Sequence, residues 1–172
     1  MELSHAELLE SFASAFTKEG LPAQLLAKGA HAPFDQLFLE LPPLPNGSKM
    51  RMELLFLAEH DSMTSLQVFI RLPFTFDAES VASLGRIIPL VNEQLPITGF
   101  GFNEQNRWVY YRHCHFCNPQ NLAFEEVNRL CSLTVYMIRQ FGGVIGGVST
   151  GKMSLEEGTA KVQSILNGQK GN

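Results

Sequence analysis

The chain has 172 residues and a formal net charge of −4, and 45% of its residues are hydrophobic against 17% charged. This composition can bury the core of one domain, which excludes a globally disordered chain. The acidic balance argues against a nucleic-acid binder, which needs a basic face to displace counterions, and against binding to an anionic membrane surface. We therefore predict a single domain over residues 1–172, with a core of about 2–141 and a helical extension of about 152–167.

The cellular compartment is indicated by the cysteines and by the N-terminus. Cys114, Cys117 and Cys131 give an odd count without the spacing of a disulfide framework, which is typical of a reducing compartment. The N-terminal sequence MELSHAELLESF has neither the basic region nor the apolar core of a signal peptide. No apolar run approaches the ~20 residues that cross a bilayer. We expect a soluble cytoplasmic protein.

The first half of the chain changes from helical to strand periodicity. Ser4 and Glu7 form a capping box that predicts a helix over His5–Lys18, and a short helical turn is expected at Ala23–Lys28. Alternation of apolar and polar residues then predicts three strands. These strands form an antiparallel meander over Leu37–Leu41, Met50–Ala58 and Leu66–Leu72, with turns at Asn46–Gly47 and His60–Ser62 and a stop at Pro73.

The second half alternates helices with one hairpin. A helix is expected after Asp77, with a kink or an early end near Ile88 because Pro89 follows. The remaining elements are a hairpin of Ile97–Phe102 and Arg107–Phe116, a helix over Leu122–Phe141, a glycine-rich joint, and a helix opened by a capping box of Ser154 and Glu157. The fold class is α+β, a five-stranded, mainly antiparallel sheet in the order β-β-β-α-β-β with the N-terminal and C-terminal helices packed on it.

The segment GGVSTGKM, Gly146 to Met153, resembles a phosphate-binding loop. However, Met153 replaces the hydroxyl residue that would hold Mg²⁺, and a helix precedes the segment where such a loop follows a strand. A nucleotide hydrolase at Gly146–Lys152 therefore remains an alternative, and we favour a joint between two helices.

The segment HCHFC could bind a metal ion or another small ligand. On a strand, His113, His115 and Cys117 would face one way and could converge on zinc. A structural zinc site needs a fourth ligand, and no second pair of ligands with matching spacing is present. We predict no metal, no cofactor and no enzymatic activity, with a metal or small-ligand sensor that uses these three residues as the alternative.

Two strands of the meander carry apolar residues on both faces. Leu55 and Leu57 lie opposite Met52 to Phe56, and Phe69 lies opposite its apolar neighbours in the next strand. A sheet covered by helices on one side should be polar on the other. The second face must then be covered by the C-terminal helices, a symmetric copy or a partner segment. We predict partner contacts at Leu55, Leu57, Phe69 and Phe74.

The order of elements resembles the type III secretion chaperone fold, and within it the YbjN-like family of bacterial proteins. The resemblance rests on LVNEQLPITGFGFNEQNRWVYYRHCHF, Leu90 to Phe116, with Asn92, the Leu95-Pro96 dipeptide and a following strand with Tyr110 to Arg112. A long apolar helix and GKMSLEE, Gly151 to Glu157, continue it. HCHFC and the double glycines depart from the family pattern.

The resemblance implies a small acidic homodimer that holds an extended segment of a partner protein against a hydrophobic sheet face or groove. Together with the two-faced apolar strands, it favours a non-enzymatic, chaperone-like protein-interaction module. The identity of the partner protein is not encoded in any of these motifs.

Overall fold

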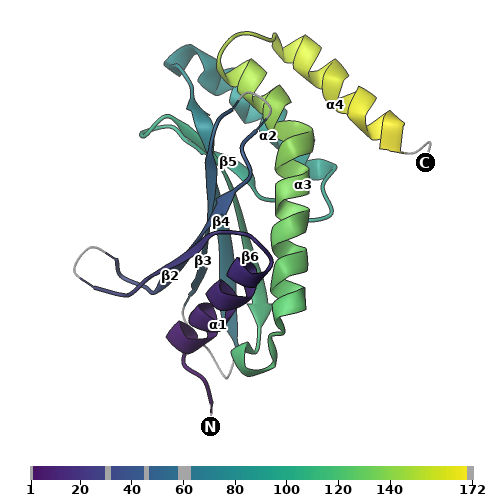
Figure 1. The fold of residues 1–172 in the computed structure, drawn as a ribbon. Helices are drawn as coiled ribbons and strands as arrows, with labels where there is room; N and C mark the ends of the chain where they lie inside the picture. The colour runs from purple at the N-terminus through teal and green to yellow at the C-terminus, as the bar shows by residue number, and fades with distance from the viewer. Residues whose placement is uncertain (1, 30–31, 45–46, 58–62, 170–172) are drawn as a thin grey trace. The chain divides into compact units, whose positions relative to one another are not determined.

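The computed structural model describes residues 2–29, 32–44, 47–57 and 63–169. Over these residues the chain is α+β, with an open antiparallel sheet of six strands in the order β1-β2-β3-β4-β6-β5 and four α-helices (Figure 1). The strands are β1 (Ala23–Leu26), β2 (Gln36–Leu41), β3 (Met50–Phe56), β4 (Thr64–Thr75), β5 (Phe100–Asn103) and β6 (Trp108–Cys117). The helices are α1 (His5–Lys18), α2 (Val81–Glu93), α3 (Phe124–Ser149) and α4 (Leu155–Gln169), with short 3₁₀ turns at Ala78–Ser80 and Pro119–Asn121.

The capping boxes predicted from the sequence are present at two helix starts. At α1 the Glu7 backbone N–H donates to Ser4 Oγ, and Glu7 Oε2 accepts from the Ser4 backbone N–H at 2.7 Å. The same pair of bonds joins Ser154 and Glu157 before α4. Each box satisfies backbone donors that the first turn of a helix leaves free.

The sheet has six strands rather than the predicted five, because Ala23–Lys28 does not form a helical turn. Ala23–Leu26 instead pairs with β2 as an antiparallel edge strand, with Leu25 opposite Leu37 and Leu26 opposite Gln36. Four residues are too few for periodicity to separate helix from strand. Pairing with β2 therefore decides the conformation, and local sequence does not.

The stop predicted at Pro73 is wrong, and so is the early end that was one of the two alternatives at Pro89. β4 continues through Pro73 to Thr75, and the register of β4 with β3 covers Leu66 to Ile70, so Pro73 removes no hydrogen bond from that ladder. The helix α2 likewise does not end near Ile88 but continues through Pro89 to Glu93.

The glycine-rich passage is helical rather than a flexible joint. α3 continues past the predicted end at Phe141, and the glycines of Gly142–Gly147 lie inside it. Val144, Ile145 and Val148 are buried, and their packing outweighs the cost of about 1 kcal/mol that each glycine adds in a helix interior. The predicted turns at Asn46 and at residues 60–62 lie outside the described residues.

The chain divides into two compact units, residues 1–70 with 112–132 and residues 71–111 with 133–172. In the first unit α1 packs against β1, β2 and β3, and its Phe12 and Phe16 rings contact Phe124 at the start of α3. The even-numbered residues of β3, from Met50 to Phe56, are buried on this helix-covered side. The His5 ring of α1 stacks on Phe56 with 4.4 Å between the centroids.

The second unit has a core around Tyr111 of β6. This side chain is fully buried, and its hydroxyl donates to the Ile97 carbonyl at 2.8 Å. Burial raises the pKa of the Tyr111 hydroxyl, so it stays a protonated donor. Among the described helices, none is both long enough and apolar enough to span a membrane.

Candidate functional site

One face of the first unit's sheet is formed by side chains that point away from α1 and α3. We call it the open face and define it by Leu26, Phe38, Arg51, Glu53, Leu55, Gln67, Phe69 and Phe116. Residues that are directly opposite in neighbouring antiparallel strands have their side chains on the same face of the sheet. The register therefore places the first seven residues on one face, through the pairs Leu26–Gln36, Phe38–Glu53, Glu53–Phe69 and Leu55–Gln67. Among the residues that the structure describes, the helices of this unit lie on the other side.

Phe116 is assigned to the open face by its neighbours in β6. His115 Nε2 lies 2.8 Å from Glu126 Oε1 of α3, and Cys117 is buried with its thiol hydrogen-bonded to the Leu66 backbone. Because side chains alternate along a strand, Phe116 points to the opposite side.

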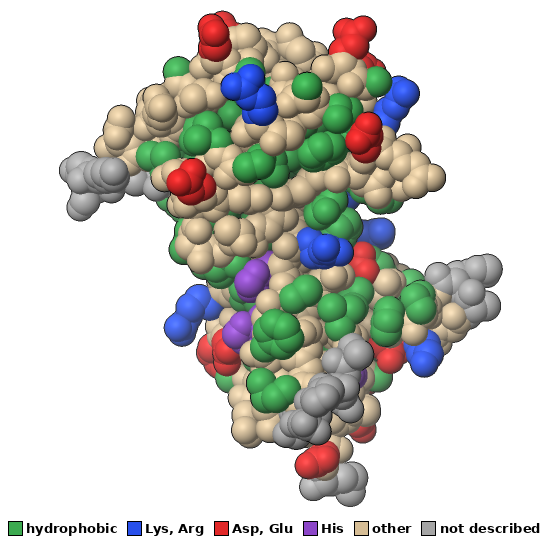
Figure 2. Space-filling view, turned by 180° about the vertical axis from the view of Figure 1, so that it is seen from behind, with side chains coloured by type: hydrophobic (Ala, Val, Ile, Leu, Met, Phe, Trp, Pro, Cys, Tyr) green, Lys and Arg blue, Asp and Glu red, His purple; other side chains and the backbone are tan. Residues whose placement is uncertain are grey.

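Apolar side chains on the open face are only partly covered. Phe116 is 75% exposed and Leu26 is 44% exposed, while Phe38 and Phe69 are half-buried. One side of the molecule is seen in Figure 2, where hydrophobic side chains gather at the surface with charged side chains beside them. A large aromatic ring that remains mostly in water on a sheet face indicates an interaction surface more than a packing role.

The open face also carries charges of both signs. The Arg51 guanidinium lies 4.2 Å from the centroid of the Phe38 ring, a cation–π contact. Glu53 accepts a hydrogen bond from Gln36 Nε2 at 2.9 Å. Burial raises the pKa of the Glu53 carboxyl, and the positive charge of Arg51 offsets this only in part.

The four residues predicted as partner contacts separate into different positions. Phe69 is half-buried on the open face, and Leu57 is half-buried directly after β3. Leu55 points to the open face but is only 4% exposed, so the single chain already covers it. Phe74 belongs to the second unit, where its ring packs against Gly146 of α3. Sequence reasoning missed Phe116 because it was considered only as part of HCHFC.

The histidines and cysteine of HCHFC do not come together as a metal site. In the described part of the chain, no group of three or more His, Cys, Asp or Glu side chains is placed to hold a metal ion. His115 is instead paired with Glu126. Burial raises the pKa of the Cys117 thiol and raises that of Cys131 to about 12, which disfavours the thiolate that acts as ligand or nucleophile.

The segment that resembles a phosphate-binding loop lies at a junction of two helices. Gly146 and Gly147 are in the last turns of α3, and Gly151 has a positive φ of 67° between the two helices. The helix α3 leads directly into this segment, whereas a phosphate-binding loop follows directly after a strand. The joint that we favoured over Gly146–Lys152 is therefore right only in its second part, because α3 continues to Ser149 and residues 150–154 alone connect it to α4.

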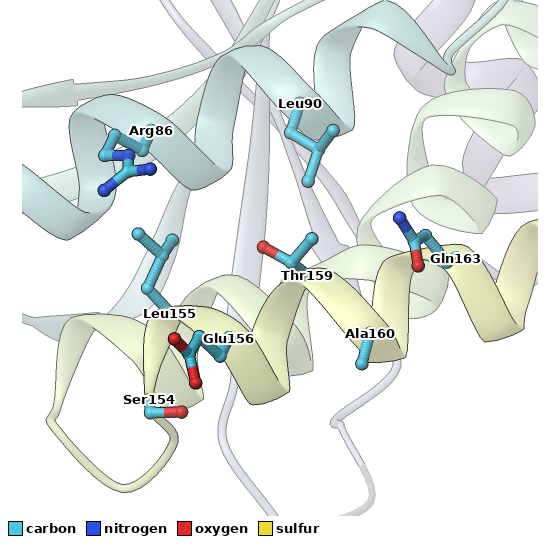
Figure 3. A pocket seen from close by; sticks show the side chains of 8 residues that line it. All are labelled: Arg86, Leu90, Ser154, Leu155, Glu156, Thr159, Ala160 and Gln163. Carbon is cyan, nitrogen blue, oxygen red and sulfur yellow. The ribbon is translucent and has the colours of Figure 1, made fainter.

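An open groove of about 700 Å³ lies between α2 and α4 in the second unit. It is lined by Arg86, Leu90, Ser154, Leu155, Glu156, Thr159, Ala160 and Gln163. Figure 3 shows Leu155 and Thr159 pointing from α4 toward α2, and Leu90 pointing toward α4. Its polar side chains are on the surface and are not bonded into a common arrangement, so the groove lacks the convergent groups of an active site.

The groove depends on a close approach of α4 at Gly158. A Cβ atom at this position would lie 2.7 Å from Cγ2 of Val148, a short branched side chain that cannot move aside. We expect Gly158→Ala to lower the free energy of unfolding, because overpacking of about 1–3 kcal/mol exceeds the gain of about 1 kcal/mol in helix propensity.

The matched control is Gly143→Ala in α3, where a Cβ atom meets nothing within 4 Å. This substitution should raise the free energy of unfolding by about 0.5–1 kcal/mol. Urea unfolding followed by circular dichroism measures both. Equal shifts of the same sign would contradict the close packing of α4.

No family model matches the chain, and no curated protein matches it. The assignment of the candidate site therefore depends on the structure alone.

Proposed function

We propose that the chain is a non-enzymatic protein-interaction module whose open face binds an apolar segment of another polypeptide. The observation that carries this is the 75% exposed Phe116 on a sheet face without a covering helix in the described chain. Burying one such ring contributes about 1.5–3 kcal/mol to association. Partly covered Phe69 on the neighbouring strand β4 adds to this, and Leu26 extends the apolar surface to the edge strand β1.

The surrounding chemistry supports binding rather than catalysis. Tyr111 and the thiols of Cys117 and Cys131 have raised pKa values, so they are not activated as nucleophiles at neutral pH. The resemblance to YbjN-like, type III secretion chaperone-like proteins belongs to the same proposal, as do the homodimeric state and the cytoplasmic location. A metal or small-ligand sensor is less favoured because His115 is engaged by Glu126.

Photo-crosslinking tests the proposal directly. p-Benzoylphenylalanine is placed at Phe116 in cells of the natural host, and at Phe34 as the matched control. Phe34 is also an exposed phenylalanine, at 42%, but it lies in a bend before β2 and not in a strand of the sheet. We expect a crosslinked polypeptide from position 116 that is absent from position 34.

A second substitution on the same face sharpens the result. Leu26→Ser should weaken the crosslink from position 116, since Leu26 shares the surface. If position 116 gives no more crosslinking than position 34, the open face is not an interaction surface and the proposal is wrong.

A further inference from the structure

We propose that a separate surface, in the second unit of the chain, binds a proline-rich segment of another protein in the polyproline II conformation. We call this surface the aromatic platform and define it by Arg71 of β4 and by Trp108 and Tyr110 of β6. The inference goes beyond the proposed function, because the open face belongs to the first unit and shares no residue with the platform.

The aromatic platform is on the face of the second unit's sheet that is opposite Tyr111. The side chains of Val109 and Tyr111 are fully buried, and Tyr111 Oη lies 3.8 Å from Met137 Sδ of α3. Because side chains alternate along a strand, Trp108 and Tyr110 point to the other face. There both aromatic residues are half-buried, so each keeps part of its ring in contact with water.

Each ring of the platform is held by a neighbouring strand, since β6 lies between β4 and β5. Gly101 of β5 is directly opposite Tyr110, and a Cβ atom at Gly101 would lie 2.6 Å from Cζ of the Tyr110 ring. The Tyr110 ring thus occupies the space that a side chain would take at Gly101. The Arg71 guanidinium lies 4.4 Å from the centroid of the Trp108 ring, a cation–π contact. Both rings are therefore ordered before a ligand binds, which lowers the entropy lost on binding.

The platform also offers hydrogen-bond donors. Within the described residues, Trp108 Nε1–H has no hydrogen-bond partner and Arg71 has no ion pair, so the donors of both side chains remain available. An indole and a guanidinium can donate but cannot accept. Electrostatic complementarity then requires a ligand that brings acceptors to Trp108 and Arg71.

A proline-rich segment has this chemistry. Proline keeps its carbonyl acceptor but has no backbone N–H, so it brings acceptors without donors that would need partners. In the polyproline II conformation the carbonyls form no internal hydrogen bonds, and the chain is already extended. Proline rings pack on exposed aromatic side chains in this mode of recognition. A single-stranded nucleic acid would also combine stacking with acceptors, but the net charge of −4 repels a polyanion.

Intrinsic fluorescence tests the proposal, because Trp108 is the only tryptophan of the chain and reports on the platform alone. A synthetic decaproline peptide is titrated into the full-length protein. We expect a saturable change in tryptophan emission. A glycine–serine peptide of the same length, which carries backbone N–H donors and no rings, should give no saturable change.

Substitutions locate the binding surface. Arg71→Ala and Tyr110→Ala should each weaken decaproline binding about 10-fold or more. Tyr136→Ala is the matched control, since Tyr136 is a 48% exposed tyrosine of α3, and it should leave the affinity unchanged. If Tyr110→Ala does not fold, as judged by thermal melting, Arg71→Ala alone is compared with wild type, because Arg71 is exposed and its removal should preserve the fold.

Three results would overturn the proposal. They are a wild type that gives no saturable response to decaproline, an equal response to the glycine–serine peptide, and an unchanged affinity in Arg71→Ala. A response to a thymidine oligonucleotide of ten nucleotides, without a response to decaproline, would replace the proline-rich segment by single-stranded nucleic acid. The crosslink from position 116 tests the open face separately, so either proposal can fail while the other holds.

Discussion

Leu55→Ala should lower the free energy of unfolding by about 2–5 kcal/mol, although this residue points to the open face. Its side chain is 4% exposed, so removal of three carbon atoms leaves a cavity that the neighbours fill only in part. Leu55 therefore supports the open face from beneath and does not form its outer surface. Chemical unfolding of the purified variant measures the change.

Phe116→Ser on the same face is the matched comparison. Because this ring is mostly in water, the substitution should change the free energy of unfolding by less than about 0.5 kcal/mol. Both variants are measured in dilute solution, where self-association adds nothing to apparent stability. A large loss of stability in Phe116→Ser would mean that the ring packs within its own chain, against the role we give it.

Asn92→Ala should cost about 2–4 kcal/mol of folding stability. The Asn92 side chain binds the outer edge of β5, where Nδ2 donates to the Phe100 carbonyl at 2.9 Å and Oδ1 accepts from the Phe100 N–H at 3.1 Å. The side-chain amide of Asn92 thus supplies hydrogen bonds to this edge that a neighbouring strand would otherwise make. Without it, two partly buried backbone groups of Phe100 lose their partners, and each unsatisfied group costs about 1–3 kcal/mol.

Asn121→Ala is the control for the loss of an asparagine. Asn121 is exposed in the 3₁₀ turn at Pro119–Asn121, and its substitution should be close to neutral. Thermal unfolding of the two variants separates the loss of the Asn92 hydrogen bonds to Phe100 from the effect of removing any asparagine side chain. Equal stability of Asn92→Ala and wild type would show that the edge of β5 needs no partner.

Local patterns in the sequence predicted the elements that local physics determines. The capping boxes at Ser4 and Ser154 are confirmed, and so is the meander of β2, β3 and β4. A capping hydrogen bond joins residues three positions apart, and the alternation of apolar and polar residues can be read within a single strand, so both are visible in a short stretch of sequence. The strand β1 and the helical glycines of α3 were missed, because pairing with β2 and burial of Val144 and Ile145 decide them over long range.

The candidate site was predictable only in part. Alternation placed Leu55 and Phe69 on the second face of the meander, but it could not show that the chain itself buries Leu55. Phe116 could have been found from the same rule, since His115 and Cys117 on one side require Phe116 on the other. The pairing of His115 with Glu126 was not predictable, because it depends on how α3 begins beside β6.

Sedimentation equilibrium of the wild type across micromolar concentrations tests most directly whether another polypeptide covers the open face. We predict twice the mass of one chain for the wild type, a shift toward single-chain mass for Phe116→Ser, and no shift for Phe34→Ser. A wild type that keeps single-chain mass throughout, with no crosslink from position 116 in cells, would contradict the account.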